Sequence, residues 1–182
     1  MKIEHEVLIK DNEITVDGKA LFTRKDIEAA AFLQEAYRAL QFNYPKFFKM
    51  DNLSKLAFLA AENLMKEAGL DKDSGNENMA VILYNSSSSL DVDIRFQDSM
   101  EIIPSPSLFV YTLPNVMMGE ICIKYKIYGE NYLFIIEKYD KDLMLAHAEN
   151  MMKNSRCAKM MVGYADFCVP SAEAHFLLIG VM

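Results

Sequence analysis

The chain has 182 residues, of which 52% are hydrophobic and 25% are charged. This length fits one folded domain, and this composition is typical of a globular protein and not of a disordered one. The formal net charge of -7 predicts repulsion from a phosphate backbone, so we expect no nucleic-acid partner.

The sequence gives no signal for a membrane span, for export or for a metal site. No apolar run approaches the roughly 18 residues that a spanning helix needs, and the first ten residues mix charged and apolar side chains, unlike a signal peptide. The cysteines and histidines stand at unrelated spacings, without a C-x-x-C pair. These residues are Cys122, Cys157, Cys168, His5, His147 and His175. We expect a cytoplasmic protein with no cofactor and no metal.

The N-terminal segment predicts a β-hairpin. Apolar and polar side chains alternate over residues 3–9 and again over residues 14–16. Asp11 and Asn12, between the two runs, are residues that favour a tight turn. The pattern indicates a hairpin extension over residues 1–20.

Two amphipathic helices are predicted next. Residues 24–42 carry apolar side chains at helical spacing, with Thr23 as the expected cap. A second helix is predicted to begin at the cap Asp51 and to end at Gly69, because glycine favours the left-handed conformation that follows many helices.

Strands and helices alternate through the rest of the chain. The predicted strands cover residues 79–84, 132–136, 158–162 and 175–181, and the predicted helices cover residues 116–127 and 142–153. This alternation favours an α/β fold with a mostly parallel, mixed, five-stranded sheet and helices on both faces.

Chemical motifs are sparse. No glycine-rich phosphate loop and no G-x-S-x-G nucleophile motif is present. The serine run 86–89 follows the predicted strand 79–84, at the end of a strand where ligands gather in α/β sheets. The same run also suits a turn and a helix entry. From chemistry alone, the residues indicate no enzyme class.

Three segments, in order, resemble the N-terminal half of a β-ketoacyl-ACP synthase. Phe48-Lys49-Met50-Asp51 is similar to the entry of a long family helix, residues 103–120 are similar to the family's Pro-rich segment and the helix after it, and Ile127-Tyr128-Gly129-Glu130-Asn131 is similar to its Gly-Pro-Ser turn. The resemblance spans residues 43–166. It implies a thiolase-like half-domain, with residues 1–182 as a single ketosynthase N-terminal-like domain.

The resemblance also implies that catalytic residues are missing. In active members the nucleophilic cysteine follows the glycine of the Gly-Pro-Ser turn by nine residues, and counting from Gly129 reaches Lys138. A lysine ammonium cannot form the thioester on which the family's chemistry depends. The family's catalytic histidines belong to the other half. We therefore expect a protein that is not itself a condensing enzyme.

The function that follows is that of a chain-length-factor-like subunit in fatty-acid or polyketide synthesis, which pairs with an active ketosynthase. The resemblance implies a dimer, with itself or with a synthase, through the strand 132–136, and possible contact with an acyl carrier protein. The residues expected to contact an acyl chain or the partner are Phe109, Leu113, Met117 and Met118, although core packing explains each equally well.

Two alternatives stay open. One is a stand-alone module that binds an acyl carrier protein or a hydrophobic small molecule near Ser86, Ser87 and Leu90. The other is an enzyme of unrelated chemistry that uses Glu137, Lys138 and Asp140, which a polar helix entry also explains.

Overall fold

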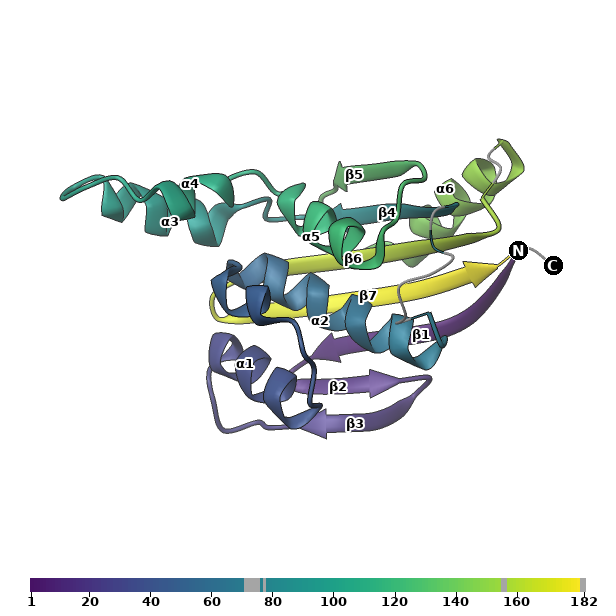
Figure 1. The fold of residues 1–182 in the computed structure, drawn as a ribbon, viewed down its shortest axis with the longest axis horizontal. Coiled ribbons are helices and arrows are strands. Elements are labelled where there is room, and N and C mark those ends of the chain that lie inside the picture. The colour runs from purple at the N-terminus through teal and green to yellow at the C-terminus, as the bar shows by residue number, and fades with distance from the viewer. Residues whose placement is uncertain (71–75, 77, 155–156, 181–182) are drawn as a thin grey trace.

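A computed structural model describes residues 1–70, 76, 78–154 and 157–180 (Figure 1). Seven strands form one sheet in the order β3-β2-β1-β7-β6-β4-β5. They are β1 (Lys2–Lys10), β2 (Glu13–Val16), β3 (Lys19–Thr23), β4 (Met79–Asn85), β5 (Asn131–Ile135), β6 (Lys159–Cys168) and β7 (Ser171–Gly180). The last residue of the predicted strand 175–181 lies outside the described residues.

The sheet confirms the expected mixed α/β class but differs from the prediction in two ways. It has seven strands and not five, and parallel pairing is confined to β5-β4-β6. The reason is that the N-terminal hairpin is part of the sheet, because β1 pairs antiparallel with both β2 and β7. The tight turn at Asp17 and Gly18, both at positive φ, then adds β3.

Strand β6 is longer than the predicted strand 158–162 because Gly163 does not end it. A Cβ atom on Gly163 would lie 2.7 Å from the ring of Phe176 on β7. The glycine therefore lets a neighbouring aromatic ring lie flat over the backbone of a continuous strand. The antiparallel register between β6 and β7 runs on to Cys168.

Helices cover both faces of the sheet. The helices are α1 (Ala29–Ala39), α2 (Asn52–Glu67), α3 (Leu90–Ser99), α4 (Pro106–Val110), α5 (Val116–Tyr125) and α6 (Lys141–Asn154), with a 3₁₀ turn η1 (Pro45–Lys49). Side chains of α1, α2 and α5 form the larger apolar core on one face, and α6 packs on the opposite face. None of these described helices combines the length and the apolar character that crossing a bilayer demands.

Helix α2 has the ends that the sequence predicts. The Asp51 carboxylate accepts hydrogen bonds from the amides of Ser54 and Leu53 at 3.0 and 3.2 Å. At the other end Gly69 has φ of 66°, and the Leu70 amide donates to the Met65 carbonyl at 2.8 Å. Both ends are local capping motifs, which is why a single sequence reveals them.

Two predicted helix ends are wrong. Helix α1 begins at Ala29 after Glu28, because Thr23, the expected cap, pairs with Glu13 in the sheet. Helix α5 is expected to end at Gly129 but ends at Tyr125, because Lys126 after it adopts the left-handed conformation at φ of 53°. Gly129 has a different role: a Cβ atom there would lie 2.2 Å from the carbonyl oxygen of Met79, so only glycine lets the chain pass the start of β4.

Helices α3 and α4 extend beyond the ends of the strands as an arm (Figure 1). We call residues 90–113 the arm. The two helices contact each other, and several large apolar side chains of the arm are exposed, with Ile102 at 89%. An apolar surface that projects from a monomer in this way is typical of an interaction site.

Candidate functional site

A polar cluster lies where β4 and β6 end. Asp166 of β6 accepts hydrogen bonds from the backbone amides of Ser86 and Ser87 at 3.2 and 2.7 Å, and from the Ser87 hydroxyl at 2.8 Å. The side-chain amide of Asn85 also donates to Asp166, at 3.0 Å. One carboxylate therefore fixes the loop that links β4 to α3.

The cluster continues across the sheet through aromatic side chains. The Ser86 and Tyr164 hydroxyls are 2.9 Å apart, and the ring of Tyr164 meets that of Tyr139 edge to face at 5.3 Å. Tyr139 in turn hydrogen-bonds to Nδ1 of His175. These contacts connect the loop after β4 to the loop before α6.

A carboxylate on β1 ends this chain of contacts. Nε2 of His175 pairs with Glu6, and Nζ of Lys141 lies 2.8 Å from the same Glu6 oxygen. Lys141 is the first residue of α6. Glu6 therefore holds the start of α6 against the sheet.

The ionisation states follow from burial and contacts. Burial, followed by the nearby Glu6 carboxylate, raises the pKa of Tyr139, so its phenol keeps its proton in the hydrogen bond with Nδ1 of His175. Nε2 then carries the hydrogen that it donates to Glu6. Burial acts to raise the pKa of Glu6, but hydrogen bonds from Lys141 and His175 outweigh it and hold that pKa below the ordinary 4.5. Each donor in the network faces an acceptor, which favours a positioning role.

Lys138 does not join this network. It lies in the link between β5 and α6, and its side chain is exposed, as is that of Glu137. Asp140 is the residue that caps α6, because its carboxylate accepts the Leu143 amide at 2.9 Å. Of the three residues considered for unrelated enzyme chemistry, one is therefore a helix cap and two point to solvent.

The three cysteines lie away from the entry to α6. Cys122 belongs to α5, Cys157 precedes β6, and Cys168 ends β6. All three are free. Burial raises the pKa of Cys122 to about 11, so this thiol is almost entirely protonated at neutral pH and is a poor nucleophile.

The four predicted apolar contact residues divide into two pairs. Phe109 and Leu113 are 61% and 59% exposed on the arm, whereas Met117 and Met118 are 1% and 8% exposed. The two methionines are part of the larger core. Core packing therefore accounts for Met117 and Met118, and only Phe109 and Leu113 present a surface to another molecule.

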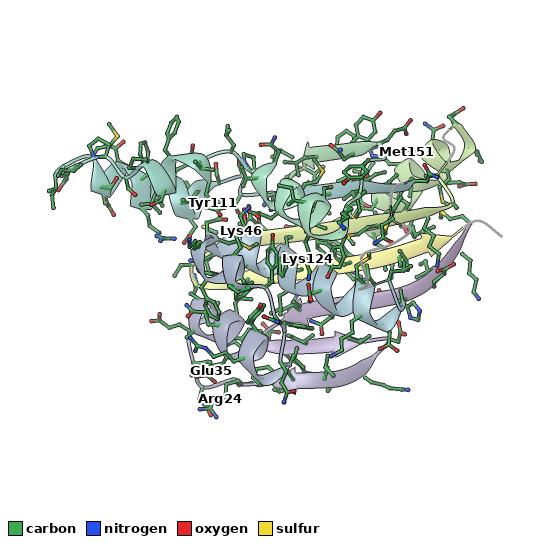
Figure 2. The ribbon with its side chains drawn as sticks, in the orientation of Figure 1. Arg24, Glu35, Lys46, Tyr111, Lys124 and Met151 are labelled. Carbon is green, nitrogen blue, oxygen red and sulfur yellow. The ribbon has the colours of Figure 1, made fainter. Side chains whose placement is uncertain are left out.

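An ion pair between a buried carboxylate and an exposed lysine anchors the base of the arm. Glu120 of α5 is buried, and its carboxylate lies 2.8 Å from Nζ of Lys46. It also accepts the hydroxyl of Tyr111 at 3.2 Å, and Figure 2 shows Lys46 and Tyr111 side by side. The pairing with Glu120 raises the pKa of Lys46, which keeps the ammonium charged.

Strand β5 forms an exposed edge of the sheet. It pairs only with β4 among the described strands, and its sequence Asn-Tyr-Leu-Phe-Ile has no charged residue. Ile135 is 53% exposed. The opposite edge, β3, begins with Lys19 and is followed by Arg24, charges of the kind that protect an edge from pairing.

Sequence reasoning missed most of the polar network. Tyr139 and His175 are separated by 36 residues and His175 and Glu6 by 169, and neither spacing is a motif. The one signal in the sequence was the serine run after a buried strand, which lies at the sheet end where the cluster forms.

Solved structures of ketosynthases and chain length factors have a similar fold. The ishigamide ketosynthase/chain length factor structure matches with a TM-score of 0.70 at 17% identity, over 98% of this chain and 61% of that chain. A ketosynthase in complex with its chain length factor from Xenorhabdus doucetiae gives a TM-score of 0.69 at 12% identity, over 100% and 79%. A β-ketoacyl synthase from Burkholderia phymatum STM815 gives a TM-score of 0.61 at 12% identity. This match covers 78% of this chain and 45% of that chain.

The chain spans less than two thirds of the ishigamide protein and under half of the Burkholderia synthase. No protein-family model and no curated protein sequence matches it. At such low identities the structural likeness establishes the fold and nothing finer. The chain therefore has the fold of the ketosynthase and chain-length-factor structures that it matches.

Proposed function

We propose that this protein is a non-catalytic, chain-length-factor-like subunit that pairs with an active ketosynthase through the β5 edge and the arm. The observation that carries the proposal is the uncharged, exposed edge of β5 on a ketosynthase-type fold. An open edge of this kind offers backbone hydrogen bonds to a second strand and is otherwise a site of aggregation.

The arm supplies the apolar part of the proposed contact. Phe109 and Leu113 are exposed, and the ring of Phe109 packs against Phe96 at 5.5 Å, so the surface is held in a fixed shape. The Lys46–Glu120 pair fixes its base. Aromatic side chains are enriched at protein interfaces, and a surface that is already ordered loses less entropy on binding.

The absence of catalysis is part of the proposal. Lys138, which the resemblance places at the family's cysteine, is exposed and two residues before the Asp140 cap of α6. No thiol stands in the segment 136–144. The start of α6 therefore offers no thiol on which an acyl thioester could form, and the partner synthase supplies the cysteine for the condensation reaction.

Co-expression with an active full-length ketosynthase from the same genome tests the proposal. We expect a stable complex that co-purifies, and we expect Ile135→Lys to abolish it, because a charge beside the edge opposes strand pairing. Val169→Lys is the matched control, since Val169 is equally apolar and 68% exposed but lies in the β6–β7 turn. No complex, or equal loss with both variants, would contradict the proposal.

The alternative, a stand-alone binding module, predicts a different result. Ser86 and Ser87 use their hydroxyls on Tyr164 and Asp166, so a ligand there has to displace internal hydrogen bonds. Mass spectrometry of the protein purified alone separates the two cases, because the module retains a bound small molecule whereas the subunit carries none at this loop.

A further inference from the structure

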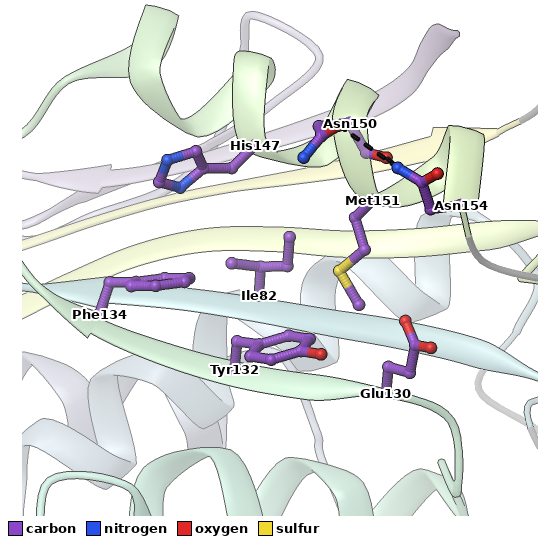
Figure 3. A pocket seen from close by; sticks show the side chains of 8 residues that line it. All are labelled: Ile82, Glu130, Tyr132, Phe134, His147, Asn150, Met151 and Asn154. Atoms are coloured by element: carbon purple, nitrogen blue, oxygen red, sulfur yellow. Dashed lines mark hydrogen bonds between the residues drawn. The ribbon is translucent and has the colours of Figure 1, made fainter.

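A cleft of about 400 Å³ lies between β5 and the second half of α6 (Figure 3). Ile82 of β4 forms its floor, and Tyr132 and Phe134 of β5 form one wall. Met151 reaches down from α6 toward Tyr132. The cleft lies at the far end of α6 from the Asp140 cap and the polar cluster, so it is separate from the network described above.

The wall of the cleft is a flat aromatic platform. The rings of Tyr132 and Phe134 are nearly parallel, with centroids 6.3 Å apart and an angle of 15° between their planes. Buried Tyr84 stacks on Phe134 at 5.4 Å. Rings that are held side by side in this way present a broad π face to the space beneath α6.

His147 of α6 lies beside Phe134, and contacts with Phe134 and Tyr84 hold it in place. Its ring lies 5.2 Å from that of Phe134, and its Nδ1 is 2.9 Å from the Tyr84 hydroxyl. Burial raises the pKa of Tyr84 to about 12, so the phenol keeps its proton, and its hydroxyl shares a hydrogen bond with His147.

The charge of the cleft is negative. Glu130, at its mouth, places a carboxylate beside Tyr132. Asn150 and Asn154 line the rim from α6 and are joined by a hydrogen bond, and their carbonyl oxygens are acceptors. The described residues that line the cleft include no lysine or arginine. Aromatic faces, a carboxylate and a thioether together favour a cation over an anion.

We propose that this cleft binds a planar aromatic cation, stacked on Tyr132 and Phe134 with its charge toward Glu130. The ring faces supply stacking and cation–π attraction, Met151 closes over the opposite face of the molecule, and Glu130 selects the charge. Such a site goes beyond the proposed subunit function, and it does not depend on a partner because all of its walls belong to this chain.

Fluorescence anisotropy on the purified chain tests the proposal with two planar tricyclic dyes of similar size. Proflavine is a cation and 9-anthracenecarboxylate is an anion. We expect saturable one-to-one binding of proflavine, and at least about tenfold weaker binding of 9-anthracenecarboxylate, because the cleft attracts one charge and repels the other. Equal affinity for the two dyes, or no saturable binding of proflavine, would overturn the proposal.

Variants locate the binding. Tyr132→Leu keeps an apolar side chain but removes a stacking face, and we expect about tenfold weaker proflavine binding. Glu130→Gln is expected to weaken it about threefold. The matched controls are Tyr128→Leu, which changes an exposed ring before β5, and Glu137→Gln, beyond its other end; both should leave binding unchanged.

If circular dichroism finds that Tyr132→Leu is misfolded, Glu130→Gln decides the question, because Glu130 is exposed and its loss leaves the fold intact. Binding that survives both variants, or that the two controls weaken equally, would overturn the proposal. Co-purification with a ketosynthase is a separate readout, so failure of dye binding leaves the subunit function standing.

Discussion

Both carboxylate oxygens of Asp166 on β6 accept hydrogen bonds from Ser87. One oxygen accepts from the backbone amide at 2.7 Å, and the other accepts from the hydroxyl at 2.8 Å. The loop between β4 and α3 therefore depends on a side chain that comes 79 residues later. Because the arm begins directly after this loop, the same contact sets the direction in which the arm leaves the sheet.

Asp166→Asn should loosen this loop. The amide that replaces one carboxylate oxygen cannot accept a hydrogen bond, so we expect a loss of about 2 kcal/mol in the free energy of unfolding, measured with urea, and faster amide exchange at Ser86 and Ser87. Asp98→Asn, at an exposed position on α3, is the control. Equal effects of the two variants would argue against the assigned role.

Glu6 makes stability depend on pH. Its pKa is lowered in the folded protein, because the hydrogen bonds from Lys141 and His175 outweigh burial. A lowered folded-state pKa means that this stabilisation is complete above the unfolded value and is lost as pH falls through the folded value. The melting temperature of the native protein should therefore fall below pH 4.5 more steeply than that of Glu6→Gln. Parallel curves for the two proteins, with Glu101→Gln as a surface control, would refute this.

Gly129→Ala should destabilise the fold. The added Cβ atom would lie 2.2 Å from the Met79 carbonyl oxygen, and relieving that overlap requires β4 and the loop before β5 to separate. We expect a cost of about 1–3 kcal/mol in thermal or urea unfolding. Gly119→Ala is the opposite case, because a Cβ atom at this position in α5 would meet nothing within 4 Å, and it should stabilise by up to about 1 kcal/mol.

The arm should govern partner affinity without affecting folding. Phe109→Ser removes an exposed ring, and we expect the complex with a ketosynthase to weaken by about tenfold or more, as measured by calorimetry. Ile123→Ser removes a side chain of similar exposure from α5, outside the arm. If both variants reduce affinity alike, the arm is not a specific contact.

The sequence predictions that are confirmed rest on local sequence signals. Asp51 and Gly69 act on neighbouring amides and carbonyls, so the ends of α2 can be read from the sequence. The strand expected at 132–136 is present as β5 (Asn131–Ile135), and it lies at the exposed edge of the sheet. Hydrophobicity alone does not distinguish a central strand from an exposed edge strand.

Long-range contacts set the limit of the sequence predictions. Met117 and Met118 were candidates for a surface contact, and only the packing of α5 on α2 assigns them to the core. Glu6, Tyr139 and His175 come from distant parts of the chain, and none of the three stood out in the sequence. Sheet order, which brings β1 beside β7, creates their network.

Amide hydrogen exchange along β5 tests the proposed pairing most directly. Val81 N donates to Glu130 O and Ile136 N donates to Asn85 O, both at 2.9 Å, so the alternate residues Leu133 and Ile135 direct their N–H groups away from β4. In the complex with an active ketosynthase, we predict that exchange at these two amides slows markedly while the amides of Tyr132 and Phe134 stay as protected as before. A complex in which Leu133 and Ile135 exchange as fast as in the free chain would contradict the account.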